Sequence, residues 1–226
     1  MKKYIIVPLV LILFVSSATA AASYPLYNLT VSFDLERNLL KGTAVIRQPE
    51  DRDITISLGG LKVLSAKVND RPVAPDAGTH LLELRGKGQA EIEYEVTFGD
   101  AREDGSVENA GVASSNLVGS KGISLTRMWY PSVSGLAMYH LDALMPDGFT
   151  GVSEAEDVTV ESSPKGRLFT FAFHEPLNEI TLAAGRYTEL KESLDGTTVH
   201  AYFFPEDAYL GKTYIDHAMK YMKMYS

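Results

Sequence analysis

The sequence contains no cysteine, a single tryptophan and fewer basic than acidic residues, 21 against 29. The lack of cysteine excludes disulfides, thiol nucleophiles and Cys-ligated metal sites, so a hydrophobic core has to hold the fold together. With 226 residues and 45 % apolar side chains, the chain can supply one large core or two smaller ones. Its formal net charge is −8 and no basic cluster reverses it locally, so neither nucleic acid nor an anionic membrane surface is an expected partner.

The N-terminus has the three parts of a cleavable secretory signal peptide. Two lysines precede an apolar run from Tyr4 to Val15, and small residues from Ser16 to Ala22 follow it. The small-x-small rule places cleavage after Ala20 or one or two residues later. A membrane anchor is the alternative, but a spanning helix needs about 20 apolar residues and this run is shorter. We therefore expect residues 1–22 to be a signal peptide that is removed.

Removal of this segment predicts where the protein works. No cysteine follows the apolar run, which excludes a lipid anchor, and the loss of Lys2 and Lys3 changes the net charge from −8 to −10. The signal peptide is of bacterial type, so we expect a periplasmic or extracellular protein. After cleavage, no stable insertion in a membrane is expected.

Beyond Tyr24 apolar and polar residues alternate, which predicts strands with one buried face. Glu36-Arg37-Asn38 separates two such runs, so residues 29–47 are expected to form a hairpin. Phe169, Phe171 and Phe173 alternate on one face and should anchor the core. Further strands are predicted at 54–58, 61–68, 79–84, 91–98, 138–145, 158–161, 167–174, 180–184 and 198–204. The sequence thus predicts a mainly β fold, with antiparallel saddle-like or sandwich-like sheets over residues 23–205.

Two segments depart from this alternation. Residues 99–122 are rich in Gly, Ser, Asn and Asp and predict a long loop. Residues 207–226 have helical spacing, with Asp207 as the predicted N-cap and apolar side chains recurring every three or four residues from Tyr214. This helix has no C-cap, and its apolar stripe needs a covering surface. Either the helix folds back on the β domain, or it belongs to a further domain within which the chain is cut.

The sequence offers no pattern for catalysis. No two of the five histidines lie three to five positions apart, so no helix presents a local pair to a metal. His174-Glu175 opens like the zinc-peptidase pattern H-E-x-x-H, but the second histidine is missing. No G-x-S-x-G elbow occurs, and Gly119-Ser120-Lys121-Gly122 lacks the spacing of a phosphate-binding loop. We therefore expect no catalytic and no metal-binding residue in this chain.

The most distinctive local segment is Arg127-Met128-Trp129-Tyr130-Pro131, which holds the only tryptophan. Since tryptophan mostly contributes buried area, the simplest interpretation is a core anchor that clamps two halves of the domain. The alternative is an aromatic wall of a substrate cleft. Arg127, Trp129, Tyr130 and Pro131 are thus the candidate residues for a cleft or a domain interface.

Five segments, taken in order, resemble parts of one known family. They are Tyr27–Arg47 as an opening hairpin, Arg127–Pro131 as an R-x-W-x-P or R-x-x-F-P segment, Leu144–Phe149 as a strand followed by P-x-G-[FY], Tyr187–Phe204 as a closing hairpin, and Thr213–Ser226 as the first helix of a following domain. Together they are similar to the N-terminal β domain of the M1-family zinc aminopeptidases. One departure is Ser132-Val133-Ser134-Gly135, which stands where many members have an acidic D-E-P and indicates a divergent, exported bacterial branch.

The resemblance implies a saddle-shaped, mostly antiparallel domain that packs against a thermolysin-like catalytic domain. That domain would hold zinc through motifs, G-x-M-E-N and H-E-x-x-H among them, that do not occur here. This chain would then carry no cofactor of its own. Its partners would be the missing catalytic domain, begun by residues 206–226, and the N-terminus of a peptide substrate.

Two functions from different classes follow. The first is a non-catalytic domain that walls the active-site cleft of an exported M1-like zinc aminopeptidase. The second is a self-standing periplasmic β-sandwich that serves as a binding or interaction module.

Overall fold

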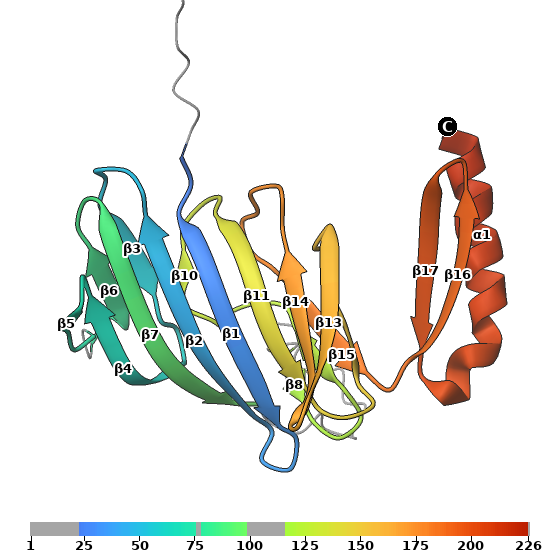
Figure 1. Ribbon diagram of the computed structural model, residues 1–226, viewed down its shortest axis with the longest axis horizontal. Helices are drawn as coiled ribbons and strands as arrows, with labels where there is room; N and C mark the ends of the chain where they lie inside the picture. Colours follow the sequence, from blue (N-terminus) through green and yellow to red (C-terminus); the bar gives the residue numbers. More distant parts are fainter. Residues whose placement is uncertain (1–22, 76–77, 99–115, 226) are drawn as a thin grey trace, which may run out of the picture.

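The fold combines one curved sheet of eight strands with three smaller sheets and a C-terminal helix (Figure 1). The computed structural model describes residues 23–75, 78–98 and 116–225. The predicted signal peptide and most of the predicted long loop, residues 99–115, lie outside the described residues. Within the described part, the prediction of a mainly β fold with antiparallel sheets and one C-terminal helix is confirmed.

The strands divide among four sheets. The eight-stranded sheet has the order β13-β14-β11-β1-β2-β7-β4-β5 and contains β1 (Leu26–Asp34), β2 (Leu39–Gln48), β4 (Lys62–Val68), β5 (Arg71–Pro72), β7 (Gly88–Thr97), β11 (Met138–Met145), β13 (Asp157–Ser163) and β14 (Gly166–Ala172). The smaller sheets contain β3 (Ile54–Ser57), β6 (Leu81–Leu84) and β10 (Ser132–Val133); β8 (Leu117–Val118), β9 (Ile123–Leu125), β12 (Thr150–Val152) and β15 (Leu182–Gly185); and β16 (Thr188–Leu194) with β17 (Thr197–Phe203). After β17 come the 3₁₀ helix η1 (Pro205–Leu210) and the helix α1 (Gly211–Tyr225).

A parallel pair of strands joins the two halves of the large sheet. β1 runs parallel to β11, with Leu26 opposite Met138 and Ser32 opposite Leu144, whereas the other paired strands of the described residues are antiparallel. A parallel pair needs a long crossover, and the hundred or so residues between β1 and β11 provide it. Through this pairing, strands from both halves of the sequence share one continuous sheet.

The core lies between the large sheet and the smaller sheets behind it (Figure 1). One buried cluster includes Ile92 of the large sheet, Ile56 of the three-stranded sheet and Leu182 of the four-stranded sheet. Phe169 and Phe171 belong to it, exposed by 2 % and 0 %, so the prediction that alternating phenylalanines anchor the core is confirmed. Each such side chain contributes about 2–3 kcal/mol by its burial.

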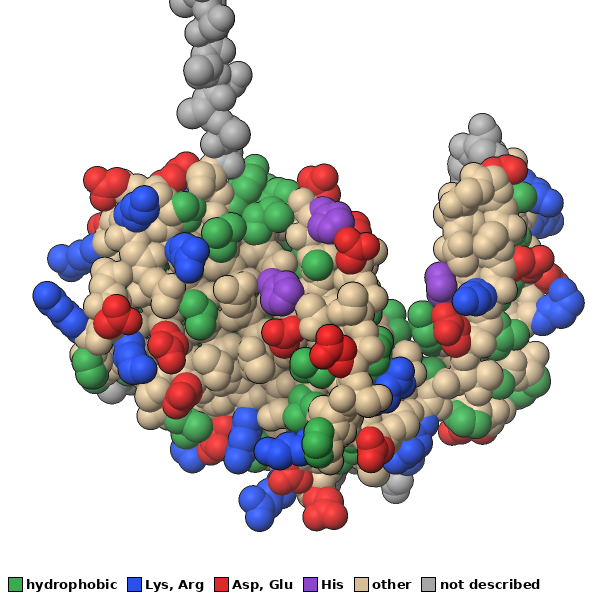
Figure 2. All heavy atoms as spheres, viewed as in Figure 1, with side chains coloured by type: hydrophobic (Ala, Val, Ile, Leu, Met, Phe, Trp, Pro, Cys, Tyr) green, Lys and Arg blue, Asp and Glu red, His purple; other side chains and the backbone are tan. Residues whose placement is uncertain are grey.

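The outer face of the large sheet is solvated and carries charges of both signs (Figure 2). On β7, Glu95 accepts a hydrogen bond of 2.6 Å from the Lys62 ammonium of β4, and this bond lowers the pKa of the Glu95 carboxyl. Glu91 lies 3.6 Å from Lys67 on the same strand pair. Such exposed ion pairs contribute little stability, but their charged groups keep this face of the sheet hydrated.

One local prediction at the C-terminal end is corrected by the structure. Asp207 is not the cap of the helix: Pro205 starts the turn of η1, the Asp207 N–H donates to the Phe204 carbonyl at 2.9 Å, and α1 begins only at Gly211. Proline fixes the backbone angle that opens a helical turn, which explains the earlier start. The closing hairpin that the resemblance implied over Tyr187–Phe204 is present as β16 and β17. The mostly polar β16 shows no apolar alternation because both of its faces are largely exposed.

Part of the predicted long loop is ordered sheet. Residues 116–122 contribute β8 and a tight turn in which the N–H groups of Gly119 and Gly122 each donate to the other's carbonyl, at 3.0 and 3.1 Å. The glycine-rich segment considered as a phosphate-binding loop is therefore the turn of the β8–β9 hairpin.

The last elements form an arm beside the large sheet, which we define as residues 188–225. Figure 2 shows an open notch between this arm and the rest of the molecule. At its base the rings of Tyr187 and Phe204 lie 5.1 Å apart between centroids. A Cβ built on Gly185 would come within 2.9 Å of Tyr187 and 3.0 Å of Phe204, so the base of the arm packs closely against β15. Helix α1 packs on the hairpin of β16 and β17.

Replacement of Tyr94 by phenylalanine is expected to stabilise the protein by about 1 kcal/mol. The Tyr94 ring is fully buried, its hydroxyl has no hydrogen-bond partner among the described residues, and burial raises its pKa. A buried hydroxyl without a partner costs its desolvation energy, which the substitution removes. Urea denaturation of the two proteins measures the difference, and a loss of stability would reveal a partner for this hydroxyl.

Candidate functional site

The segment that holds the only tryptophan lies between β9 and β10. Met128 has a positive φ of 55°, which turns the chain so that Met128 is 61 % exposed while Trp129 next to it is 0 % exposed. The Trp129 indole N–H donates to the carbonyl of Ile180 at 3.2 Å, and its ring meets the Tyr130 ring edge-on at 4.7 Å. Trp129 thus fastens the chain between β14 and β15 to the core.

Tyr130 and Tyr139 hold the same stretch of chain. The Tyr130 hydroxyl accepts the Ile180 N–H at 3.1 Å and lies 3.5 Å from the Tyr139 hydroxyl. Tyr139 in turn donates to the carbonyl of Asn178 at 3.2 Å. Burial is the main cause that raises the pKa of both hydroxyls, so they stay protonated near neutral pH. These two tyrosines and Trp129 form what we call the aromatic clamp.

Arg127 is the candidate residue that reaches solvent. Its side chain is 81 % exposed, and its Nε lies 3.6 Å from the carboxylate of Glu179, inside the stretch that the aromatic clamp holds. The Arg127 carbonyl accepts a hydrogen bond of 2.6 Å from the side-chain amide of Asn116, whose oxygen also accepts the Thr126 N–H at 2.8 Å. Neither Asn116 nor Glu179 stands out in the sequence, because single polar residues in loops carry no pattern.

The structure therefore separates the four candidate residues. Trp129, Tyr130 and Pro131 are buried, and only Arg127 presents its side chain to solvent. In this arrangement the aromatic rings position the chain between β14 and β15 and do not line an open surface. Arg127 and Glu179 form a charged pair at the solvent-exposed rim of this stretch. A role for these residues in a domain interface stays a prediction.

Replacement of Tyr130 by phenylalanine should cost about 1.5 kcal/mol, the opposite sign to the same change at Tyr94. The Tyr130 hydroxyl satisfies the buried N–H of Ile180, and its removal leaves that donor without a partner. Urea denaturation measures the cost, and hydrogen exchange at the Ile180 amide shows whether the effect is local. Unchanged exchange at Ile180 would contradict the assigned contact.

The arm carries the exposed apolar residues of helix α1. Ile215 is buried against the hairpin, whereas Tyr214, Tyr221 and Met224 are exposed by 61 %, 59 % and 65 %. Tyr209 of η1 is exposed by 76 %. We call these four residues the outer stripe of the arm. Exposed aromatic and methionine side chains are enriched in surfaces that bind another protein or domain.

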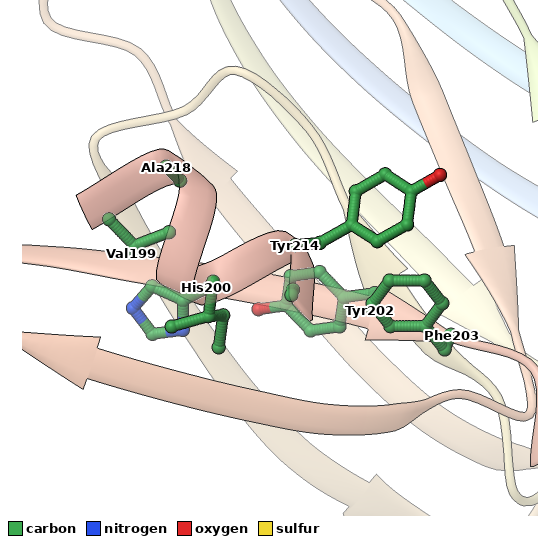
Figure 3. Close-up of a pocket in the computed structure, with 8 residues that line it drawn as sticks. Val199, His200, Tyr202, Phe203, Tyr214 and Ala218 are labelled. Atoms are coloured by element: carbon green, nitrogen blue, oxygen red, sulfur yellow. The ribbon is translucent and has the colours of Figure 1, made fainter. Parts of the chain in front are cut away.

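A shallow cavity of about 230 Å³ lies between β17 and α1, with His200, Tyr202 and Tyr214 among its lining residues (Figure 3). His200 Nδ1 lies 2.7 Å from a carboxylate oxygen of Glu189 on β16, and this contact is the main cause that lowers the pKa of Glu189. The Tyr202 hydroxyl donates to the same oxygen at 3.3 Å. The three side chains tie the two strands of the hairpin together.

Two other histidines also pair singly with carboxylates. His140 lies 3.6 Å from Asp142, and His174 lies 2.9 Å from Asp157. In the described residues no group of three or more His, Asp or Glu side chains is placed to hold a metal ion. The residues present there do not fit a zinc site. Among the same residues, no helix has the length and apolar character that crossing a membrane requires.

The sequence matches no protein-family model and no curated protein. Solved structures of M1 zinc metallopeptidases are nevertheless similar in fold. Two are from Deinococcus radiodurans, one of them a mutant bound to a Tyr-Ser-Ala substrate, and each matches with a TM-score of 0.59 at 16 % identity. A two-domain M1 zinc metallopeptidase bound to L-arginine matches with a TM-score of 0.60, also at 16 % identity.

Each of these matches covers 79 % of this chain but only 46 % of the solved chain. This chain therefore spans about half the length of the enzymes that it resembles. At 16 % identity the likeness shows the fold, and the resemblance predicted from the sequence is confirmed at that level.

Proposed function

We propose that this chain is the non-catalytic N-terminal domain of an exported, M1-like zinc aminopeptidase. The observation that carries the proposal is the match of nearly four-fifths of the chain to about half of M1 zinc metallopeptidase structures. The sequence supports it in two ways. Its N-terminus is of signal-peptide type, and it lacks the H-E-x-x-H pattern that a catalytic domain would carry. The catalytic zinc would belong to a following domain, where it would supply Lewis-acid chemistry to peptide hydrolysis.

The role proposed for this domain is to wall one side of the active-site cleft and to steer the N-terminus of a peptide. Two features of the structure support this role. The notch beside the arm offers a concave surface, and the outer stripe of the arm offers an apolar surface to the following domain. The exposed ion pair of Arg127 and Glu179, positioned by the aromatic clamp, is a further polar contact that the surface offers.

The experiment that tests this function starts from the product that the cells export. The mass of this product should correspond to a polypeptide roughly twice as long as this chain, because this chain matches only 46 % of the length of the solved structures. It should hydrolyse aminoacyl substrates, lose this activity with a zinc chelator and regain it with added zinc. A stable exported product no longer than this chain, without such activity, would instead favour the self-standing binding module.

Truncation of the outer stripe tests the proposed contact with the following domain. In the intact exported protein, the double variant Tyr214→Ala and Tyr221→Ala should destabilise the contact between domains by about 2 kcal/mol, the scale of a central aromatic interface residue. Thermal unfolding followed by calorimetry measures the loss of coupling between the two domains. The variant Lys220→Ala, on the same exposed helix, is the control and should leave the transition unchanged. Equal effects of the two changes would argue against the contact.

A further inference from the structure

The first described residue of the chain meets a carboxylate. The backbone nitrogen of Ser23 lies 3.2 Å from Oε1 of Glu50, within hydrogen-bond distance, and both residues are half-buried. No lysine or arginine of the described residues forms an ion pair with Glu50. The Glu50 carboxylate therefore has the Ser23 nitrogen as its partner in the part of the chain that the structure describes.

The turn that carries Glu50 is fixed from within. Gln48, at the end of β2, is fully buried, and its side-chain amide donates to the carbonyl of Arg52 at 3.0 Å. The Arg52 N–H donates back to the carbonyl of Glu50 at 2.9 Å. These bonds fix the backbone of the turn that carries Glu50 without any contribution from Ser23.

The segment that follows Ser23 is fixed as well. Pro25 is buried, and its carbonyl accepts the Met138 N–H of β11 at 2.9 Å. Ser23 is thus held between Glu50 on one side and the edge of the β1–β11 pair on the other. Tyr24 and Pro25 form one wall of a cavity of about 440 Å³, which Arg52 and Leu136 help to line.

The sequence provides a cleavage site at this position. Two small-x-small triplets overlap in the N-terminal segment, Ala18-Thr19-Ala20 and Ala20-Ala21-Ala22. Cleavage after the first leaves Ser23 as an internal amide, two residues from the new end. Cleavage after the second makes the Ser23 nitrogen the new terminus itself.

We propose that signal peptidase cuts between Ala22 and Ser23, and that the new terminal ammonium of Ser23 docks on Glu50. In this step the amide bond between Ala22 and Ser23 breaks. Water supplies the hydroxyl of the Ala22 carboxyl group and a hydrogen to the Ser23 nitrogen, which then takes up a proton from solvent. The ammonium forms where the N–H already points, so the mature N-terminus needs no rearrangement to pair with the carboxylate.

The ion pair is stronger than the bond that an internal amide can make at the same place. The amide N–H already donates to a charged acceptor; the ammonium adds a full positive charge beside the Glu50 carboxylate, and partial burial limits the screening of this attraction. Cleavage one or two residues earlier would forgo this pairing. The inference rests on the proposed export; it selects one of the cleavage positions expected from the sequence and adds the site that receives the new terminus.

Sequencing of the N-terminus of the exported protein is the first test. The full chain, exported by a bacterium with its own signal peptide, should begin at Ser23. A protein that begins at Ala21 would overturn the docking site and leave export standing. A protein that retains Met1 would overturn both the docking site and the proposed export.

A pair of exported proteins then tests the contact itself. Glu50→Gln should lower the midpoint of thermal unfolding by about 2 °C, the shift expected for the loss of one partly buried ion pair in a domain of this size. The matched background is Ala22→Leu. Leucine disrupts the second small-x-small triplet, so cleavage should occur after Ala20 and the Ser23 nitrogen should remain in an amide bond. In that background Glu50→Gln should shift the midpoint by less than about 1 °C. Equal shifts in the two backgrounds, or no shift in either, would overturn the proposal.

Discussion

Trp129→Ala is expected to lower the free energy of unfolding by about 4 kcal/mol, within the range for a buried tryptophan. The ring is 0 % exposed, stacks edge-on against Tyr130 and donates its N–H to the Ile180 carbonyl. The truncation creates a cavity and leaves a buried carbonyl without its donor. Since a domain of this size has about 5–15 kcal/mol in total, a loss of 4 kcal/mol would remove between about a quarter and four-fifths of its stability.

Urea denaturation measures this effect, and two further variants separate its causes. Met128→Ala is the control, because Met128 is exposed and should change stability by less than about 0.5 kcal/mol. Trp129→Phe keeps an aromatic ring but removes the N–H donor, so it should cost about 1–2 kcal/mol. A cost of Trp129→Ala below about 1.5 kcal/mol would mean that the ring does not anchor the chain between β14 and β15.

Gly42→Val is expected to cost about 3 kcal/mol, the upper end of the range for overpacking. Gly42 lies in the middle of β2, paired with Val31 of β1 and with Tyr94 of β7. The Tyr94 ring covers it: a Cβ built on Gly42 would meet the ring carbon Cζ, with the hydroxyl oxygen at 2.5 Å and Cε1 at 2.7 Å. Valine is a better strand former than glycine by at most about 1 kcal/mol, so the steric overlap decides the sign.

A double-mutant cycle with Tyr94→Leu shows whether the ring is the cause. In the Tyr94→Leu background the space above Gly42 is open, and Gly42→Val should then cost about 1 kcal/mol or less. Gly60→Val is the control for a glycine that has nothing within 4 Å of its Cβ position, and it should be nearly neutral. If Gly42→Val cost as much without the Tyr94 ring as with it, backbone strain and not packing would be responsible.

Much of the fold follows from the period of the apolar residues. The runs around Leu29 to Leu35 and Met138 to Met145 alternate, and each became a strand with one buried face. Alternation did not reveal β16, which has two exposed faces, or β8, which is two residues long and leads into a turn closed by backbone bonds between Gly119 and Gly122. Burial of one face produces alternation, and strands without such a face leave no such trace.

The candidate segment shows a second limit of sequence reasoning. The sequence singled out Arg127, Trp129, Tyr130 and Pro131 but left their roles open between the core and a cleft wall. The structure distributes them, with three buried and Arg127 at the rim beside Glu179. The partners of these residues, Ile180 above all, lie about 50 positions away and contribute backbone groups. No pattern of side chains in the sequence predicts a contact that is made through a backbone carbonyl or N–H.

The sequence alone determined the class of the fold, the helix at its end, the absence of thiol chemistry and the lack of a zinc-peptidase motif, because these depend on composition, local period and residue spacing. Only the tertiary structure decided the parallel pairing of β1 with β11, the burial of Trp129 and the approach of the Ser23 nitrogen to Glu50. Each of these joins residues distant in sequence. The alternation of apolar and polar residues is the same whether a neighbouring strand is parallel or antiparallel. Contacts between strands distant in sequence are therefore decided only when the whole chain packs.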